Sequence, residues 1–137
     1  MDFMERLNDR INSIEGLPIS SKLGYLGADE SLVLYPLPGS TPIALYMDGT
    51  KDEAINYEIS MKSKSQNKIN TTLWLIARTL ERVRTINSLD DSFEFQEITI
   101  TNMPYVNNAD EQGWYTFNLN VRATITNKEK ERYINET

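Results

Sequence analysis

The longest periodic stretch of apolar residues predicts a helix over residues 65–86. Within SQNKINTTLWLIARTLERVRTI, apolar residues recur mostly every three or four positions, so they form one stripe along a helix. The stripe consists of Ile69, Leu73, Ile76, Ala77, Leu80, Val83 and Ile86. Ser65 suits the N-cap, because its hydroxyl can accept a hydrogen bond from a free N–H group of the first turn. This long helix is expected to cover one face of a sheet.

Alternation of apolar and polar residues predicts β-strands on both sides of this helix. The expected strands span residues 31–36, 43–47, 51–62, 92–101 and 115–125. The last of them alternates without a break, which is typical of a strand with one buried and one solvated face. Asp48-Gly49 suits the tight turn of a hairpin, because both residues tolerate positive φ. These patterns indicate an antiparallel or mixed sheet of about five strands.

The fourth expected strand breaks the alternation. Phe93 and Phe95 share one face of an extended chain, whereas Ile98 and Ile100 share the opposite face. A bulge near Gln96-Glu97 would return all four side chains to one side. The alternative is a strand that is covered on both faces.

A short amphipathic helix is expected over residues 2–15, and Gly16 and Pro18 are expected to end it. Other segments are interpreted as irregular: the connection 19–30, the polar loop 102–113 and the charged, frayed tail 127–137. The sequence therefore predicts one α+β domain over residues 1–137, with its core at about 31–126. In that fold the long helix packs on one face of the sheet, together with the short N-terminal helix.

Composition excludes several kinds of site. The 137 residues include no cysteine and no histidine, so there is no disulfide or thiolate site and no histidine base or metal ligand. A net charge of −6 argues against broad binding of phosphate. No apolar run approaches the roughly 20 residues that span a membrane. We expect no cofactor, metal or catalytic residue, no membrane association and no sequence-specific contact with nucleic acid.

Acidic pairs are the one feature that leaves an enzyme open. They are Asp29-Glu30, Asp52-Glu53, Asp90-Asp91 and Asp110-Glu111. Their spacing matches no calcium loop, so solvated turn carboxylates are the simpler interpretation. A carboxylate-based hydrolase carries no short motif and stays open as an alternative. A deep pocket with two facing carboxylates would favour it, whereas exposed apolar strips would favour assembly.

Charge is segregated along the chain. From Lys62 to Arg84, six basic residues accompany a single acid, Glu81, which gives +5. From Thr85 to Glu111, six carboxylates accompany no basic residue, which gives −6. The two blocks suit contact between neighbouring copies, or they are two solvated faces without a partner. The expected interface residues are Lys68, Arg78, Arg82, Arg84, Asp90 and Asp91, with the apolar patch Met103, Pro104, Tyr105 and Val106 at its centre.

Several runs of the sequence resemble a family of phage proteins. They are LYPLPGS at 34–40, the Met-Asp-Gly turn at 47–49, AINYEISMKSK at 54–64, NTTLWLIARTLE at 70–81, SFEFQEITITNMPYV at 92–106 and GWYTFNLNVRATIT at 113–126. Together they resemble small minor capsid proteins of long-tailed phages and prophages of Gram-positive bacteria, a group similar to tail terminators. The resemblance covers roughly residues 34–126, and its marks are packing and turn residues.

The resemblance implies a structural protein without catalytic residues. A tail terminator is a ring, commonly a hexamer, that caps the tail tube at its head-proximal end and joins it to the head. The expected partners are therefore further copies of the chain, the tail tube protein and a head connector protein. The expected location is the virion, assembled in the bacterial cytoplasm. A head-completion protein, or a module that binds a small ligand or peptide on the same fold, stays open as an alternative.

Overall fold

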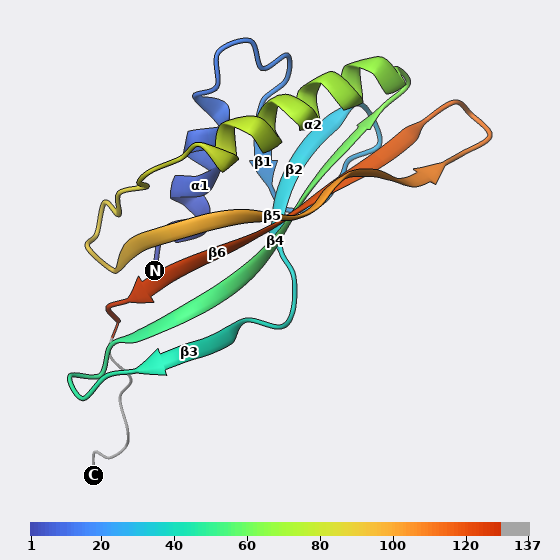
Figure 1. Ribbon diagram of the computed structural model, residues 1–137. Helices are drawn as coiled ribbons and strands as arrows, with labels where there is room; N and C mark the ends of the chain where they lie inside the picture. Colours follow the sequence, from blue (N-terminus) through green and yellow to red (C-terminus); the bar gives the residue numbers. More distant parts are fainter. Residues whose placement is uncertain (130–137) are drawn as a thin grey trace.

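The computed structural model describes residues 1–129 of the chain. They form two helices and a six-stranded sheet (Figure 1). In chain order the elements are α1 (Phe3–Asn12), β1 (Ser21–Leu23), β2 (Ser31–Pro36), β3 (Thr41–Leu45), β4 (Lys51–Ser63), α2 (Gln66–Glu81), β5 (Phe93–Ala109) and β6 (Tyr115–Asn127). The α+β class is confirmed. The predicted frayed tail lies outside the described residues from 130 onward, whereas Asn127 still belongs to β6.

The sheet is mixed and is organised around β4. The strand order is β1-β2-β4-β6-β5, and β3 pairs with β4 beside this path. β4 pairs with β6 over its whole length, while its other edge is shared between β2 at residues 57–62 and β3 at residues 51–54. All pairings are antiparallel except that of β1 with β2. The prediction of about five strands is therefore corrected to six.

The additional strand is β1, which lies inside the connection 19–30 that the sequence predicts to be irregular. Three residues are too few to show an alternation, and side chains of α1 position them instead. The Ser21 backbone N–H donates to Asn12 Oδ1 at 2.7 Å, and the Asn12 Nδ2 returns a bond to the Ser21 carbonyl at 2.9 Å. The Ser21 hydroxyl also donates to Asn8 Oδ1 at 2.7 Å. The strand is thus fixed by tertiary contacts, which no local pattern reveals.

Helix α2 begins where the sequence predicts and ends earlier. Ser65 is the N-cap, and its Oγ accepts a bond from the Lys68 N–H at 3.1 Å. The last helical residue is Glu81, so the predicted end at residue 86 is wrong. Ile86 still reaches the core, with 5% of its surface exposed, but it does so from a non-helical segment. The apolar spacing continues to Ile86 because Ile86 also faces the core, although it lies after the helix.

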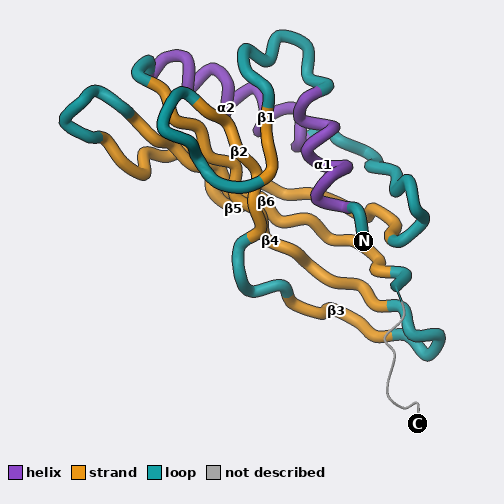
Figure 2. The backbone as a smooth tube through the Cα atoms, turned by 180° about the vertical axis from the view of Figure 1, so that it is seen from behind, coloured by secondary structure: helices purple, strands orange, loops and turns teal. Residues whose placement is uncertain are grey.

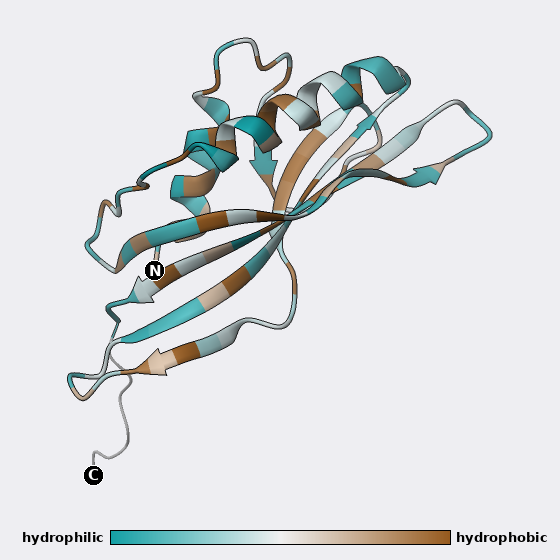
Figure 3. Ribbon diagram, in the orientation of Figure 1, coloured by the Kyte–Doolittle hydropathy of each residue, from teal (hydrophilic) through white to brown (hydrophobic). Residues whose placement is uncertain are grey.

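Both helices pack on the same face of the sheet. The buried side chains of α2, which include Leu73, Ile76, Ala77 and Leu80, share one cluster with Tyr57, Ile59, Phe117, Leu119 and Val121 of β4 and β6. This confirms the predicted core. From α1, Phe3, Leu7 and Ile11 complete the same cluster. Figure 3 shows the alternation of apolar and polar residues along the strands that supply it.

Strand β5 contains the bulge and is longer than predicted. Its register against β6 shifts between Phe95 and Glu97, so the bulge predicted near Gln96-Glu97 is confirmed. The strand continues to Ala109, and the polar loop predicted at residues 102–113 is therefore wrong. That segment pairs with β6 through further register shifts, which hide it from an alternation search. The remaining connection is a turn, with Gly113 at φ +91° and Asp110 Oδ1 accepting the Trp114 N–H at 2.9 Å.

The sheet face opposite the helices carries a hydrogen-bonded polar layer. Ser60, Asn118 and Asn120 are at least 94% buried there. Ser60 Oγ donates to Asn118 Oδ1 at 2.7 Å, and Asn120 Nδ2 donates to Glu58 Oε1 at 2.9 Å. The Tyr35 hydroxyl also donates to Glu58. Because these groups bond one another, the layer is satisfied without a covering helix.

Candidate subunit interface

The outer edge of the sheet at the end of β5 is exposed and apolar. We call residues 102–114 the arm; Figure 1 shows that its tip extends past the N-terminal end of α2. Met103 is 40% exposed, Tyr105 40% and Val106 57%. Tyr105 stands opposite Asn118 and Val106 opposite Phe117, so these neighbours point to opposite faces of the sheet. The arm therefore carries apolar surface on both sides, as expected of a segment that a partner surrounds.

The arm does not offer a regular edge for another strand. Its pairing with β6 shifts register between Ile100 and Asn102, between Asn102 and Tyr105, and between Val106 and Asn108. Pro104 lacks a backbone N–H donor. Bulges and proline at an edge prevent in-register pairing with another sheet. Contacts of the arm with a partner are therefore expected to run through side chains.

The basic residues predicted for the interface do not form one stripe. Lys68 Nζ lies 2.7 Å from Glu30 Oε1, so this charge is paired within the chain. Lys62 and Lys64 begin the basic segment 62–84. Their Nζ atoms lie 5.0 and 5.1 Å from the centroid of the Trp114 ring. Both are thereby directed to Trp114, which closes the turn at the tip of the arm. The structure removes Lys68 from the free positive charges.

Three arginines at and just after the C-terminal end of α2 keep their positive charge free of ion pairs within residues 1–129. The Arg78 guanidinium lies 5.6 Å from the centroid of Trp74, which is 37% exposed on the outer face of the helix. Arg78, Arg82 and Arg84 form no ion pair within residues 1–129. The expectation from the sequence is that the tryptophans and tyrosines mostly pack in the core, and exposed Trp74 is an exception. The signal was its place outside the apolar stripe, four residues before an arginine.

The acidic residues predicted for the interface are tied to their own chain. Asp91 Oδ1 accepts a charged hydrogen bond from Lys128 Nζ at 2.8 Å, and Glu94 Oε2 lies 3.5 Å from the same atom. Asp90 Oδ1 accepts the Ser88 hydroxyl at 2.8 Å and the Ser92 N–H at 3.0 Å. These bonds to Ser92 and Ser88 hold the pKa of Asp90 below its ordinary value.

A second apolar protrusion is the β3–β4 hairpin. Figure 2 shows β3 at the side of the sheet farthest from both helices. Ile43 is 57% exposed, Leu45 68% and Met47 fully exposed. The hairpin turn is closed by the Tyr46 N–H, which donates to the Thr50 carbonyl at 2.9 Å, with Gly49 at φ +91°. The sequence predicts a strand at residues 43–47, but its unbroken apolar run does not show which side chains stay exposed.

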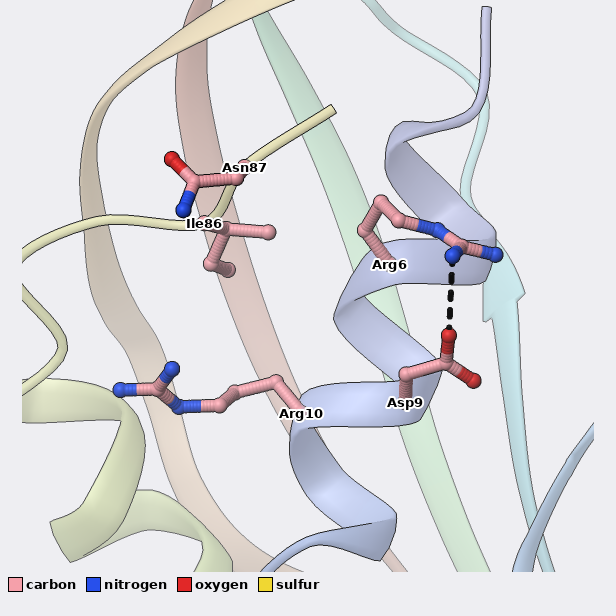
Figure 4. A pocket seen from close by; sticks show the side chains of 5 residues that line it. All are labelled: Arg6, Asp9, Arg10, Ile86 and Asn87. Carbon is pink, nitrogen blue, oxygen red and sulfur yellow. Dashed lines mark ion pairs between the residues drawn. The ribbon is translucent and has the colours of Figure 1, made fainter. Parts of the chain in front are cut away.

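An open hollow lies between α1 and the segment that follows α2. It is lined by Arg6, Asp9, Arg10, Ile86 and Asn87 (Figure 4). Arg6 Nη1 lies 3.2 Å from Asp9 Oδ2, and Arg10 extends away from that pair. The hollow has one carboxylate, which is already paired. It does not present the two facing carboxylates that glycoside hydrolysis requires.

A larger hollow lies beside residues 19–33 and includes Asp29 and Glu30. Hydrogen bonds from Lys68 and then from Ser63 lower the pKa of Glu30 below its ordinary value. A general acid requires the opposite shift. Within residues 1–129, no group of three or more acidic side chains is placed to hold a metal ion. The described helices are also too short and too polar to cross a membrane.

Comparison with known proteins decides the family. The sequence model of a family described as bacteriophage tail terminator protein matches residues 10–127. The chain belongs to this family. The resemblance to tail terminators is thereby confirmed, and the match reaches the last three residues of α1. Among curated proteins, none matches the chain.

A solved structure shares the fold of this tail terminator family member. It is a chain from the virion of a native gene transfer agent particle, with a TM-score of 0.62 and 8% sequence identity. The match covers 90% of this chain and 94% of that chain. At this identity the likeness shows the fold alone. The fold of this terminator family member is thus one that a virion also contains.

Proposed function

We propose that this protein is a structural virion component that terminates the tail at the head–tail junction. The family match over residues 10–127 carries this proposal. In the proposed role, copies of the chain close into a ring, most simply a hexamer, that caps the head-proximal end of the tail tube. Its partners are further copies of itself, the tail tube protein and a head connector protein. The proposed setting is a long-tailed phage or prophage of a Gram-positive host, with assembly in the bacterial cytoplasm.

Two features of the surface support an assembly role. The arm and the β3–β4 hairpin both expose several large apolar side chains. Exposed apolar groups of this kind mark contacts between proteins. A ring is built from heterologous contacts, in which one patch of each copy meets a different patch on the next. The proposed interface therefore joins the basic end of α2 to the acidic segment 85–111 of a neighbour, with Met103–Val106 at its centre.

The role is non-enzymatic in this proposal. Where the pKa of a carboxyl group departs clearly from its ordinary value within residues 1–129, it is lowered, as at Asp2, Glu30, Asp52 and Asp90. Hydrogen bonds to the charged form cause these shifts, and they favour structural carboxylates over proton donors. The proposal includes no cofactor, no sequence-specific contact with nucleic acid and no membrane.

Electron microscopy of a strain that lacks the gene tests the role. Loss of a terminator releases tail growth, so overlong tails are expected. Normal tails detached from filled heads would instead identify a head-completion protein. Complementation with the wild-type gene should restore tails of uniform length. Virions of normal morphology without the protein would contradict both structural roles.

A further inference from the structure

The outward face of helix α2 carries an exposed tryptophan beside an arginine, which an ordinary solvated face lacks. Asn67, Thr71, Trp74 and Arg78 lie along it at spacings of four, three and four residues. Trp74 is 37% exposed and stacks under the Arg78 guanidinium at 5.6 Å. Tryptophan and arginine are the residues that most often anchor protein contacts. All four positions are exposed.

The arm has the complementary character. No basic residue occurs from Thr85 to Gly113, and the tip carries Asp110 and Glu111. Glu111 forms no ion pair within residues 1–129. Behind the tip, Met103, Tyr105 and Val106 supply exposed apolar surface. Asp110 is bonded within the turn, and Lys62 and Lys64 lie beside Trp114 in the same turn. Glu111 and the apolar side chains behind it are therefore the groups that match a positive face with one large aromatic ring.

We infer that the arm of one copy docks on the Trp74–Arg78 face of α2 in the next copy. This inference rests on the proposed ring and names the two patches that form it. Tyr105, on one face of the arm, lies against Trp74, and Glu111 meets Arg78 and Arg82. The contact is heterologous, because arm and helix face are different surfaces of the same chain, and repeated contacts of this kind close a ring.

The β3–β4 hairpin is the competing site for the arm, and two observations count against it. Residues 41–53 carry three carboxylates and one lysine, so the hairpin repels the acidic tip. Neither the arm nor β3 offers a regular strand edge. Register shifts and Pro104 interrupt the arm, and Pro42 with the register shift beside it interrupts β3. Strand addition between them is disfavoured. A helix face needs only side-chain contact.

Asp90 and Asp91 are the competing acidic partners for the arginines. Their oxygens already accept bonds from Ser88, Ser92 and Lys128 of the same chain. Glu111 has no such bonds to lose within residues 1–129. Within the acidic segment 85–111, Glu97 and Glu111 form no ion pair with residues 1–129, and of these two only Glu111 lies on the arm beside the exposed apolar side chains.

Cross-linking through engineered cysteines tests the contact. The chain has no cysteine, so every cross-link formed by a short bifunctional maleimide joins introduced residues. Thr71→Cys places a thiol on the helix face and Asn107→Cys places one on the arm; both positions are exposed. The full-length chain carrying both changes should give a ladder of products that ends in the closed ring. Each single variant should give almost no cross-linked product, because a heterologous contact never juxtaposes two identical patches.

Charge exchange in the double-cysteine chain identifies the partners. Arg78→Glu should lower the initial cross-linking rate about tenfold, since attraction becomes repulsion. Glu111→Arg in the same chain should restore most of the rate, whereas Asp90→Lys with Asp91→Lys should not. Rescue by the Asp90 and Asp91 changes alone would overturn the inference.

Two further outcomes separate the inference from the proposed function. Replacing Asn107→Cys by Ile43→Cys moves the second thiol to the β3–β4 hairpin, and an equal ladder from that chain would overturn docking of the arm. Rings of wild-type protein on tails, seen by electron microscopy, without a ladder from the Thr71→Cys/Asn107→Cys chain would also overturn it and leave the proposed function intact. Absence of both rings and ladders would reject the ring together with the contact.

Discussion

Asp2 and Ser92 bond each other twice, although 90 positions separate them. The Asp2 N–H donates to Ser92 Oγ at 3.3 Å, and the Ser92 hydroxyl donates to Asp2 Oδ1 at 3.2 Å. The same carboxylate accepts the Ser88 hydroxyl at 2.7 Å and the Leu89 N–H at 2.9 Å. Next to it, Phe3 contacts Phe93 edge to face, with ring centroids 5.1 Å apart. The start of α1 is thereby held on the start of β5.

We predict that this contact makes stability depend on acid pH through Asp2. Burial raises the pKa of Asp2, but hydrogen bonds from Ser88, Leu89 and Ser92 outweigh it and leave the pKa lowered. A carboxyl group whose pKa is lower in the folded state stabilises the fold above its unfolded pKa of about 4, and this contribution is lost as pH falls through the folded value. The Tm of Asp2→Asn should therefore lie below that of wild type at pH 7, and the difference should shrink below about pH 4.

The comparison between the two proteins isolates Asp2 from other carboxylates. Glu30 and Asp52 also have lowered pKa values and destabilise both proteins equally in acid. Asp90 shares Ser88 and Ser92 with Asp2, so its titration is expected to change with that of Asp2. A difference in Tm that stays constant from pH 7 to pH 2.5 would contradict the assignment.

Removal of the α2 N-cap should destabilise the whole fold. Ser65 Oγ accepts the Lys68 N–H at 3.1 Å, and no acidic residue in the first turn compensates for its loss. Ser65→Ala should lower the free energy of unfolding by about 0.5–2 kcal/mol in a denaturant titration. Ser65→Asp is the matched control, because its carboxylate retains the cap and suits the helix N-terminus. Equal losses in both variants would show that the cap is not the cause.

Truncation of the core should cost more. Leu80 is fully buried and Phe117 is 5% exposed, and both belong to the cluster between α2 and the sheet. Leu80→Ala or Phe117→Ala should lower the free energy of unfolding by about 2–5 kcal/mol, since each leaves a cavity. Arg84→Ala, at an exposed position without an ion pair within residues 1–129, should change it by no more than about 0.5 kcal/mol. An unchanged Tm in either core variant would refute the packing of α2 on the sheet.

Elements with their own periodicity were predictable from the sequence. Strand β6 follows from its alternation of apolar and polar residues, and β2 follows from its strand-forming residues. The start of α2 follows from the capping Ser65. Elements that depend on distant partners were not predictable. β1 has three residues and is held by Asn8 and Asn12 of α1, while residues 102–109 pair with β6 through three register shifts.

The candidate interface was predictable in its charges but not in its pairing. The sequence placed free arginines at the end of α2 and an apolar patch at Met103–Val106. It did not show that Lys68 forms an ion pair with Glu30, 38 positions away, or that Lys128 forms one with Asp91. Ion pairs join residues that the fold brings together, so charge counts along a sequence overestimate the charge that remains for a partner.

The bulge in β5 leads to a last prediction, on single-residue deletions. Phe95 faces Ile125 and Glu97 faces Thr124, so Gln96 is the extra residue between them. Deletion of Gln96 should give a regular strand that still points Phe93, Phe95, Ile98 and Ile100 at the core, and should cost no more than about 1 kcal/mol, for one hydrogen bond to Thr126. Deletion of Thr99 is the matched control. It makes Ile98 and Ile100 adjacent, so one of them must leave the core, at a cost of about 1.5–3 kcal/mol. Equal destabilisation of the two variants in a denaturant titration would mean that the bulge does more than correct the alternation.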